Sequence, residues 1–312
     1  MMTLGAALAM VAFGPLAPPG AAAAKTAPAD SMAADHRYLD EVEGWRQKRL
    51  DRLQADDGWL TVVGLHWLKA GPTSFGAAAG NDLILPGSGT PPRAGVLTLD
   101  AATGRVTVEA ATGVTLGLRG KPVTRAILTT DASGRTPDIL TLGTITLQII
   151  DRGGRLGARV KDAHSEARRS FKGLKWYPIK PELRVRARLV RHTKPTTLDV
   201  PSIIGVTEAM PSPGIVEFQI EGKTQRLTPV LEPGEDRLFF IFKDATSGRT
   251  TYGAGRFLYA DPPPRDDGEM VLDFNEAYSP PCAFTAYATC PMPPPENRLS
   301  VPVEAGELAP SH

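Results

Sequence analysis

Residues 95–128 have the sequence GVLTLDAATGRVTVEAATGVTLGLRGKPVTRAIL, which indicates a β fold. Apolar and polar residues alternate in short runs, which are separated by turn signals such as Thr103-Gly104. A period of two residues is typical of strands that bury one face. Several such strands, spaced about 8–15 residues apart, indicate a β-sandwich or a barrel.

The composition of the whole chain agrees with this interpretation. Among the 312 residues, 31 are Gly and 29 are Pro, which is about a fifth of the chain, where average usage gives about an eighth. Turns are therefore frequent, and this disfavours a helical bundle. A hydrophobic content of 42% excludes global disorder, and a net charge of +1 excludes a nucleic-acid partner held by overall positive charge.

The chain is predicted to be mainly β, with one N-terminal helix followed by two β-rich halves. Residues 34–57 form the helix, because apolar residues recur at helical spacing, charges of both signs lie between them, and Gly58 is placed to stop it. Residues 58–163 carry the sandwich-like pattern, and residues 164–312 form the second half. The apolar positions of the helix are Leu39, Val42, Trp45, Leu50 and Leu53.

Residues 1–24 are predicted to be a secretory signal peptide. They carry no charged side chain, and their apolar stretch is shorter than the roughly 20 residues that span a bilayer. Small residues at 22–24 suit signal-peptide cleavage, so an exported, periplasmic or extracellular mature chain would begin near Lys25, with a linker over 25–33. No Lys or Arg precedes the apolar stretch, which indicates a translation start upstream of Met1. A disordered Ala/Pro-rich tail is the alternative, and no later run predicts a transmembrane segment.

Two cysteines, Cys282 and Cys290, lie close together near the C-terminus. In an exported protein this spacing favours a local disulfide. The alternative is a metal-binding pair, but the C-x2-C spacing and a clustered His are both missing, so no metal site is predicted.

Three arginines alternate with apolar residues at the start of the second half. The pattern puts Arg184, Arg186 and Arg188 on one face of a strand. Such a row can hold a carboxylate, a phosphate or an anionic glycan. It can equally be a solvated strand face or an edge protected against pairing.

The sequence contains no nucleophile elbow, zinc-protease helix, phosphate-binding loop or dinucleotide fingerprint, so no cofactor is predicted. A catalytic set assembled by tertiary contacts remains open, because such sets are recognised by geometry. His66 is predicted to be a half-buried residue of a strand. His164 is the better acid/base candidate, and Asp273 or Glu296 would supply the carboxylate.

Polar and aromatic residues gather over residues 252–297. The cysteine pair and the Pro-rich run 291–295 would stiffen this region, so a ligand would meet groups already held in place. The alternative is a braced tail that closes a sheet and binds nothing. The candidate ligand-binding residues here are Tyr252, Arg256, Asn275, Tyr278, Tyr287 and Asn297.

The first half resembles a forkhead-associated domain through Phe75-Gly76, residues 81–86 and Leu142-Gly143. The resemblance implies a similar scaffold. Those domains bind phosphothreonine through an Arg after the first Gly and a Ser-x-x-His in the next loop. Here Ala77 follows Gly76 and the loop 88–94 has no His, so no phosphopeptide binding is expected.

A second resemblance covers residues 45–307. Four segments are similar to a bacterial and archaeal family catalogued as domain of unknown function 1684 (DUF1684). The strongest similarity is in LDFNEAYSPPCAFTAYATCPMPPPEN, and the others are GWLTVVGLHWLKAG, FKGLKWYPI and TYGAGRFL. The resemblance implies no catalytic residue. It implies only that the family's identity is concentrated in residues 252–297.

Two functions from different classes remain open. The first is an exported protein that binds a small or polymeric anionic ligand, such as a glycan, in the cell envelope. The second is a hydrolase-like enzyme that uses carboxylates and a His of the second half. A pair of carboxylates within about 10 Å in a cleft would favour the enzyme.

Overall fold

The computed structural model describes residues 29–310 except 88, 133–135 and 266–267, and side chains from His36 onward. The predicted signal peptide, residues 1–24, lies outside the described residues. The fold is mainly β, with one long N-terminal helix followed by several sheets, as the alternation predicts. Among the described residues, no helix is both long and apolar enough to cross a membrane.

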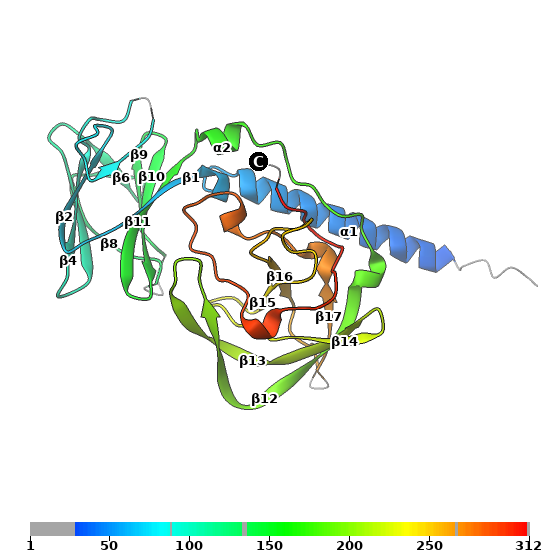
Figure 1. Ribbon diagram of the computed structural model, residues 1–312. Coiled ribbons are helices and arrows are strands. Elements are labelled where there is room, and N and C mark those ends of the chain that lie inside the picture. Colours follow the sequence, from blue (N-terminus) through cyan, green and yellow to red (C-terminus); the bar gives the residue numbers. More distant parts are fainter. Residues whose placement is uncertain (1–28, 88, 133–135, 266–267, 311–312) are drawn as a thin grey trace, which may run out of the picture.

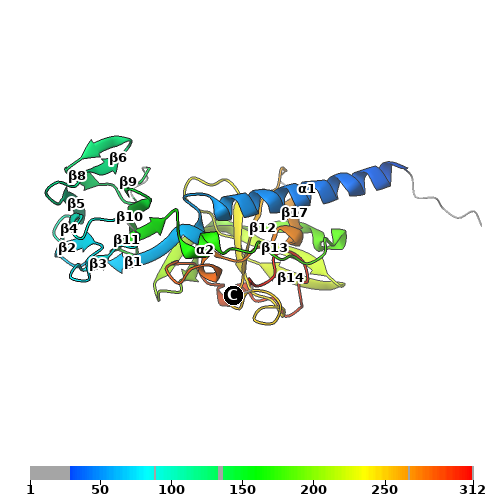
Figure 2. The same cartoon turned by 90° about the horizontal axis from the view of Figure 1, so that it is seen from above.

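Helix α1 (Ala29–Gln54) lies along one side of the second half and leads into the sandwich (Figure 1 and Figure 2). Its apolar stripe buries Val42 and Leu53, whereas the predicted stripe residue Leu39 is exposed. The linker predicted over 25–33 is wrong at 29–33, which are helical, because Ala and Met there favour a helix. The helix ends before Gly58, where a Cβ would lie 2.4 Å from the Leu53 carbonyl oxygen.

The first β-rich half is a sandwich of two sheets, which pack Phe75, Leu97, Val106, Leu140 and Ile145 between them. One sheet has the order β1 (Val62–Trp67), β11 (Arg155–Asp162), β10 (Ile145–Arg152), β9 (Ile139–Leu142), β6 (Leu116–Leu118) and β7 (Lys121–Val123). The other has the order β3 (Leu83–Ile84), β2 (Gly71–Gly76), β4 (Gly95–Asp100), β5 (Arg105–Ala110) and β8 (Arg125–Leu128). Alternation along each strand therefore builds one core between the sheets.

The second half contains a four-stranded antiparallel sheet and a separate hairpin. The sheet has the order β14 (Lys223–Leu227), β13 (Thr207–Ile220), β12 (Arg184–Pro201) and β17 (Glu269–Asp273). The hairpin pairs β15 (Leu238–Phe242) with β16 (Arg256–Ala260). Phe218, Phe240, Phe242, Leu258 and Phe274 fill the core between them.

Short helices connect and close these elements. They are Trp59–Thr61, α2 (Glu166–Arg169), Pro181–Leu183, Phe274–Glu276, Pro281–Ala283 and Pro295–Asn297. The C-terminal segment then returns to the second core, where Leu299, Val301, Val303 and Ala305 are buried. Residues 299–305 are therefore part of the fold.

Helix α1 is tied to the second half by polar contacts as well as apolar ones. The Arg46 guanidinium donates to the Tyr177 carbonyl oxygen at 2.9 Å, and that of Arg49 donates to the Ser279 carbonyl oxygen at 2.9 Å. The Tyr38 hydroxyl donates to Asp273 at the end of β17. These contacts place one end of the helix beside the edge of the sheet.

Candidate functional site

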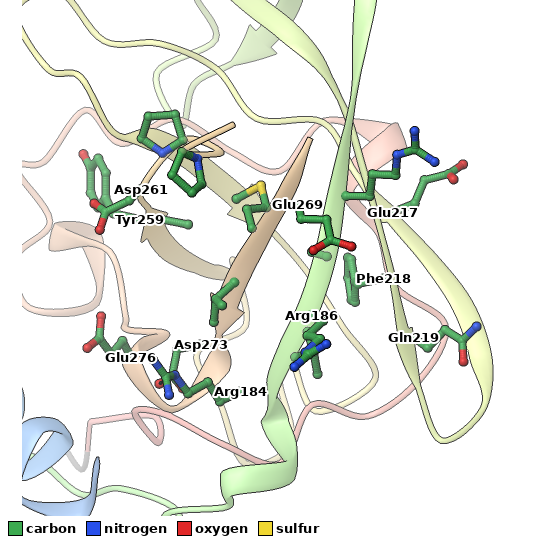
Figure 3. Close-up of a pocket in the computed structure, with 18 of the residues that line it drawn as sticks. Arg184, Arg186, Glu217, Phe218, Gln219, Tyr259, Asp261, Glu269, Asp273 and Glu276 are labelled. Atoms are coloured by element: carbon green, nitrogen blue, oxygen red, sulfur yellow. Dashed lines mark ion pairs between the residues drawn. The ribbon is translucent and has the colours of Figure 1, made fainter. Parts of the chain in front are cut away.

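A groove of about 1220 Å³ lies on the outer face of the four-stranded sheet (Figure 3). Arg184, Arg186 and Arg188 of β12 are exposed on this face, while the residues between them are buried in the second core. The period of two along β12 is therefore what brings all three arginines into the groove. The other walls come from α1, from β13 and β17, and from the segment that follows β16.

Acidic residues on neighbouring strands face two of the three arginines. The register sets Arg184 opposite Asp273, and it sets Arg188 between Glu217 and Glu269. Arg186 stands opposite the apolar Val271 on β17. Directly opposed side chains on neighbouring strands are close enough to interact. Arg186 is therefore the arginine of this row with the least compensation from β17.

Asp273 organises one end of the groove. Its carboxylate accepts hydrogen bonds from the Tyr38 hydroxyl at 2.8 and 3.0 Å, and from the backbone and side-chain nitrogens of Asn275 at 3.0 Å each. The Arg184 guanidinium lies 3.9 Å from this carboxylate and 5.1 Å from the centre of the Tyr38 ring. Arg184 is thus partly engaged within the protein, whereas no ion pair within 4.0 Å engages Arg186 or Arg188 in the described part of the chain.

Glu276 lies in the same groove, next to Asp273 (Figure 3). It is half-buried, and no hydrogen bond or ion pair joins its carboxyl group to another described residue. Burial, followed by the negative charges of Asp273 and Asp261, raises the pKa of Glu276 from 4.5 to about 7, although Arg237 and Arg184 act against this. The groove therefore contains a carboxyl group that can carry a proton near neutral pH.

The raised pKa of Glu276 predicts a specific loss of stability with rising pH. Between pH 4.5 and about 7 the folded state holds this proton and the unfolded state releases it, so the free energy of unfolding falls as pH rises through this window. Glu276→Gln removes the effect. We expect the variant to match the wild type below pH 4.5 and to be about 1–2 kcal/mol more stable at pH 8, a value that allows for solvent screening at a half-buried position.

Urea unfolding at pH 4 and pH 8 measures this difference. Exposed Glu296→Gln is the matched control, and its free energy of unfolding should follow that of the wild type at both pH values. A constant difference between Glu276→Gln and the wild type across this range would contradict the assignment.

Three of the predicted ligand-binding residues are buried in the protein. Arg256, Asn275 and Asn297 are at most 1% exposed, and their side chains hydrogen-bond within the protein. The Asn297 amide donates to the carbonyl oxygens of Thr228 at 2.9 Å and Ile241 at 3.0 Å. The C-terminal segment and the second core cover these residues, so ligand contact by them stays a prediction. They brace the fold.

The three predicted tyrosines also lie outside the groove. The Tyr252 hydroxyl donates to the Cys282 carbonyl oxygen at 2.9 Å, and Tyr278 packs on Phe257 with the Arg49 guanidinium 4.6 Å from its ring centre. Tyr287 is 42% exposed. None of the six ligand-binding residues predicted in 252–297 is therefore among the described residues that line the groove.

Two of the three predicted catalytic residues are also absent from the groove lining. His164 is exposed on the turn before α2, and Glu296 is exposed on the turn Pro295–Asn297. Asp273 does line the groove. The predicted pairing of His164 with Asp273 or Glu296 is therefore not assembled there, because those residues lie on segments that run elsewhere on the surface.

The predicted disulfide is not formed, since Cys282 and Cys290 are both free thiols. Cys282 lies in the turn Pro281–Ala283, and its backbone N–H donates to Cys290 Sγ at 3.1 Å, so this sulfur contacts the turn backbone. The Cys290 thiol hydrogen-bonds to Cys282, which lowers the pKa of Cys282 and raises that of Cys290. The loop is braced by its prolines and backbone contacts.

Sequence reasoning missed several groove residues. Tyr38 lies in the predicted N-terminal helix, to which the sequence assigned only a packing role. Glu217 and Glu269 are separated from the arginines by many residues in the chain. Glu276 stands in the predicted C-terminal stretch, and its place three residues after Asp273 was a usable signal. Strand register determines the acidic residues that face the arginines. Local sequence patterns do not predict this register.

Comparison with known proteins adds a family match to this geometry. A family model described as "Protein of unknown function (DUF1684)" matches residues 169–308, and residues 45–168 lie outside the match. No curated protein matches the chain. A solution structure of an uncharacterised protein from gene locus rrnAC0354 of Haloarcula marismortui is 33% identical, over 45% of this chain and 78% of that one, with a TM-score of 0.38. The FHA domain of FhaA, solved in complex with the intracellular domain of Rv3910, is 15% identical over 31% of this chain and 97% of that one, with a TM-score of 0.22.

Proposed function

The chain belongs to the DUF1684 family through residues 169–308, and because this family implies no activity we propose a function from the groove itself. The protein is an exported binding protein of the cell envelope, and it holds an anionic ligand along the outer face of β12. Export rests on the signal-like residues 1–24.

The observation that carries this proposal is the position of Arg186 and Arg188 in the groove. Both side chains are exposed, and no ion pair within 4.0 Å engages either of them in the described part of the chain. The arginines of this row repeat every two residues, about 6.6 Å apart along the strand. Guanidinium groups at this spacing can bind successive carboxylate or sulfate groups of an extended ligand.

Removing these two charges should weaken binding without unfolding the protein. We expect Arg186→Ser/Arg188→Ser to bind polygalacturonate and heparin at least tenfold more weakly at low salt, because each lost guanidinium removes a charge-assisted contact. The difference should shrink as salt rises, since exposed charges are screened. Binding is measured by isothermal titration calorimetry, and thermal unfolding verifies the fold.

The control variant is Lys121→Ser/Arg125→Ser, which removes two exposed charges from β7 and β8 of the sandwich. It should bind both polymers within about twofold of the wild type. Equal weakening in both double variants would mean that net charge alone attracts the polymers. That result, or no saturable binding by the wild type, would refute the proposed groove function.

One observation favours the hydrolase-like alternative. Glu276, with its pKa of about 7, stands beside Asp273 in the groove, and general acid catalysis uses a carboxyl group that is protonated near the working pH. Glu276 would replace His164 and Glu296 in that role. Release of reducing ends from polygalacturonate by the wild type, lost in Glu276→Gln while binding persists, would favour the enzyme.

A further inference from the structure

Strand β12 carries basic residues that lie outside the groove as well as those that line it. Between Leu183 and Leu198 the chain has five Arg or Lys residues and no Asp or Glu. The first three line the groove, where acids on β13 and β17 face Arg184 and Arg188. The last two, Arg191 and Lys194, lie beyond the groove, toward the far end of β12. Arg191 pairs with Gly214 on β13, whereas acidic residues pair with Arg184 and Arg188.

A β-bulge that contains residues 192–195 interrupts the ladder at this point. Arg191 pairs with Gly214, and the next pair joins Thr196 to Ser212, so residues 192–195 on β12 face only Pro213 on β13. The two strands are in close contact just before the bulge, because a Cβ on Gly214 would lie 2.3 Å from the Val190 carbonyl oxygen. Extra residues in one strand leave the ladder and redirect their side chains.

The bulge opens a pocket of about 290 Å³. Arg191, His192 and Lys194 line it together with Ser212, and no carboxylate is among the described lining residues. Neither Arg191 nor Lys194 forms an ion pair within the described residues. The Ser212 hydroxyl lies 3.4 Å from its acceptor, the Gly214 carbonyl oxygen, which is a long contact that a better acceptor can replace.

We propose that this pocket binds a phosphate group. The lining supplies a guanidinium, an ammonium, an imidazole and a hydroxyl from two strands, and such groups can donate to several oxygens of one tetrahedral anion. A planar carboxylate would need only the fork of a single arginine. The pocket volume suits a phosphate monoester or a lipid phosphodiester headgroup and is smaller than the groove. The site is separate from the groove and does not depend on the groove's proposed ligand.

The site is tested by equilibrium dialysis of the mature chain, residues 25–312, against radiolabelled inorganic phosphate at constant ionic strength. Arg191→Gln/Lys194→Gln should raise the Kd at least tenfold. The charge-matched control Lys121→Gln/Arg125→Gln and the groove variant Arg186→Ser/Arg188→Ser should stay within about twofold of the wild type. The groove variant thereby separates this site from the proposed function. Thermal unfolding verifies each fold, and Lys194→Gln alone serves if the double variant unfolds.

Sedimentation with phosphatidylglycerol vesicles distinguishes the two sources of the phosphate. Vesicle binding that Arg191→Gln/Lys194→Gln abolishes assigns the pocket to a lipid headgroup. Phosphate binding without vesicle binding assigns it to a soluble ester. The proposal is overturned if the wild type shows no saturable phosphate binding, or if the charge-matched control loses as much affinity as the bulge variant.

Discussion

Arg256→Met should lower the free energy of unfolding by about 3–5 kcal/mol, the expected cost of breaking a buried ion pair. The side chains of Arg256 and Asp244 are both 0% exposed, and a guanidinium nitrogen lies 3.5 Å from the Asp244 carboxylate. The guanidinium also donates to the carbonyl oxygens of Val303 and Ala305 in the C-terminal segment. Methionine fills similar volume but leaves the Asp244 charge buried and both carbonyl groups unsatisfied.

Urea unfolding at pH 7 measures this loss. The matched control is Arg226→Met, which breaks the exposed ion pair with Glu217 and should cost less than about 1 kcal/mol. If Arg256→Met fails to fold, Asp244→Leu/Arg256→Met becomes the decisive variant. Removing both charges should recover part of the loss, since no unpaired charge then stays buried. A loss below about 1 kcal/mol in Arg256→Met would show that Arg256 does not brace the fold.

Asn275→Ala should lower the free energy of unfolding by about 2–4 kcal/mol, because it leaves buried partners without hydrogen bonds. The Asn275 side chain is fully buried, accepts from the Lys180 backbone N–H at 2.9 Å, and donates to the Lys180 carbonyl oxygen at 2.8 Å. It also donates to the Tyr38 hydroxyl at 2.9 Å. One amide thus joins α1, the segment before β12 and the end of β17.

The control for this variant is Asn81→Ala. The Asn81 amide also donates to two carbonyl oxygens, those of Ala78 at 2.9 Å and Pro92 at 2.7 Å, but at an exposed position. Water can replace these bonds, so we expect a loss of less than about 1 kcal/mol. Thermal and urea unfolding compare the two variants. An unchanged melting temperature in Asn275→Ala would restore the interpretation of Asn275 as a ligand-binding residue.

The stability losses expected for Arg256 and Asn275 explain why residues 252–297 look like a binding site in the sequence. Polar residues that brace a fold and polar residues that hold a ligand are the same residue types. Burial distinguishes them, and burial here comes from the C-terminal residues 299–305, which return to cover the second core. The sequence of residues 252–297 by itself does not predict that residues 299–305 bury them.

The sequence alone determined the fold class and one face of the site. Alternation and turn signals are relations between residues a few positions apart, so they predict strands, a sandwich and the row formed by Arg184, Arg186 and Arg188. The structure confirms a mainly β fold that follows a single long helix. It also exposes that row on one face of β12.

The residues that surround this row of arginines depend on the tertiary structure. Tyr38 and Asp273 are 235 positions apart in the chain and share a hydrogen bond. Strand register sets Glu217 and Glu269 beside Arg188, whereas Arg191 at the bulge pairs with Gly214 and with no acid among the described residues. Exposure, pKa and charge compensation depend on distances in space between such remote residues. Local sequence patterns do not contain those distances, and for this reason they missed Glu276 in the groove and the basic pocket at the bulge.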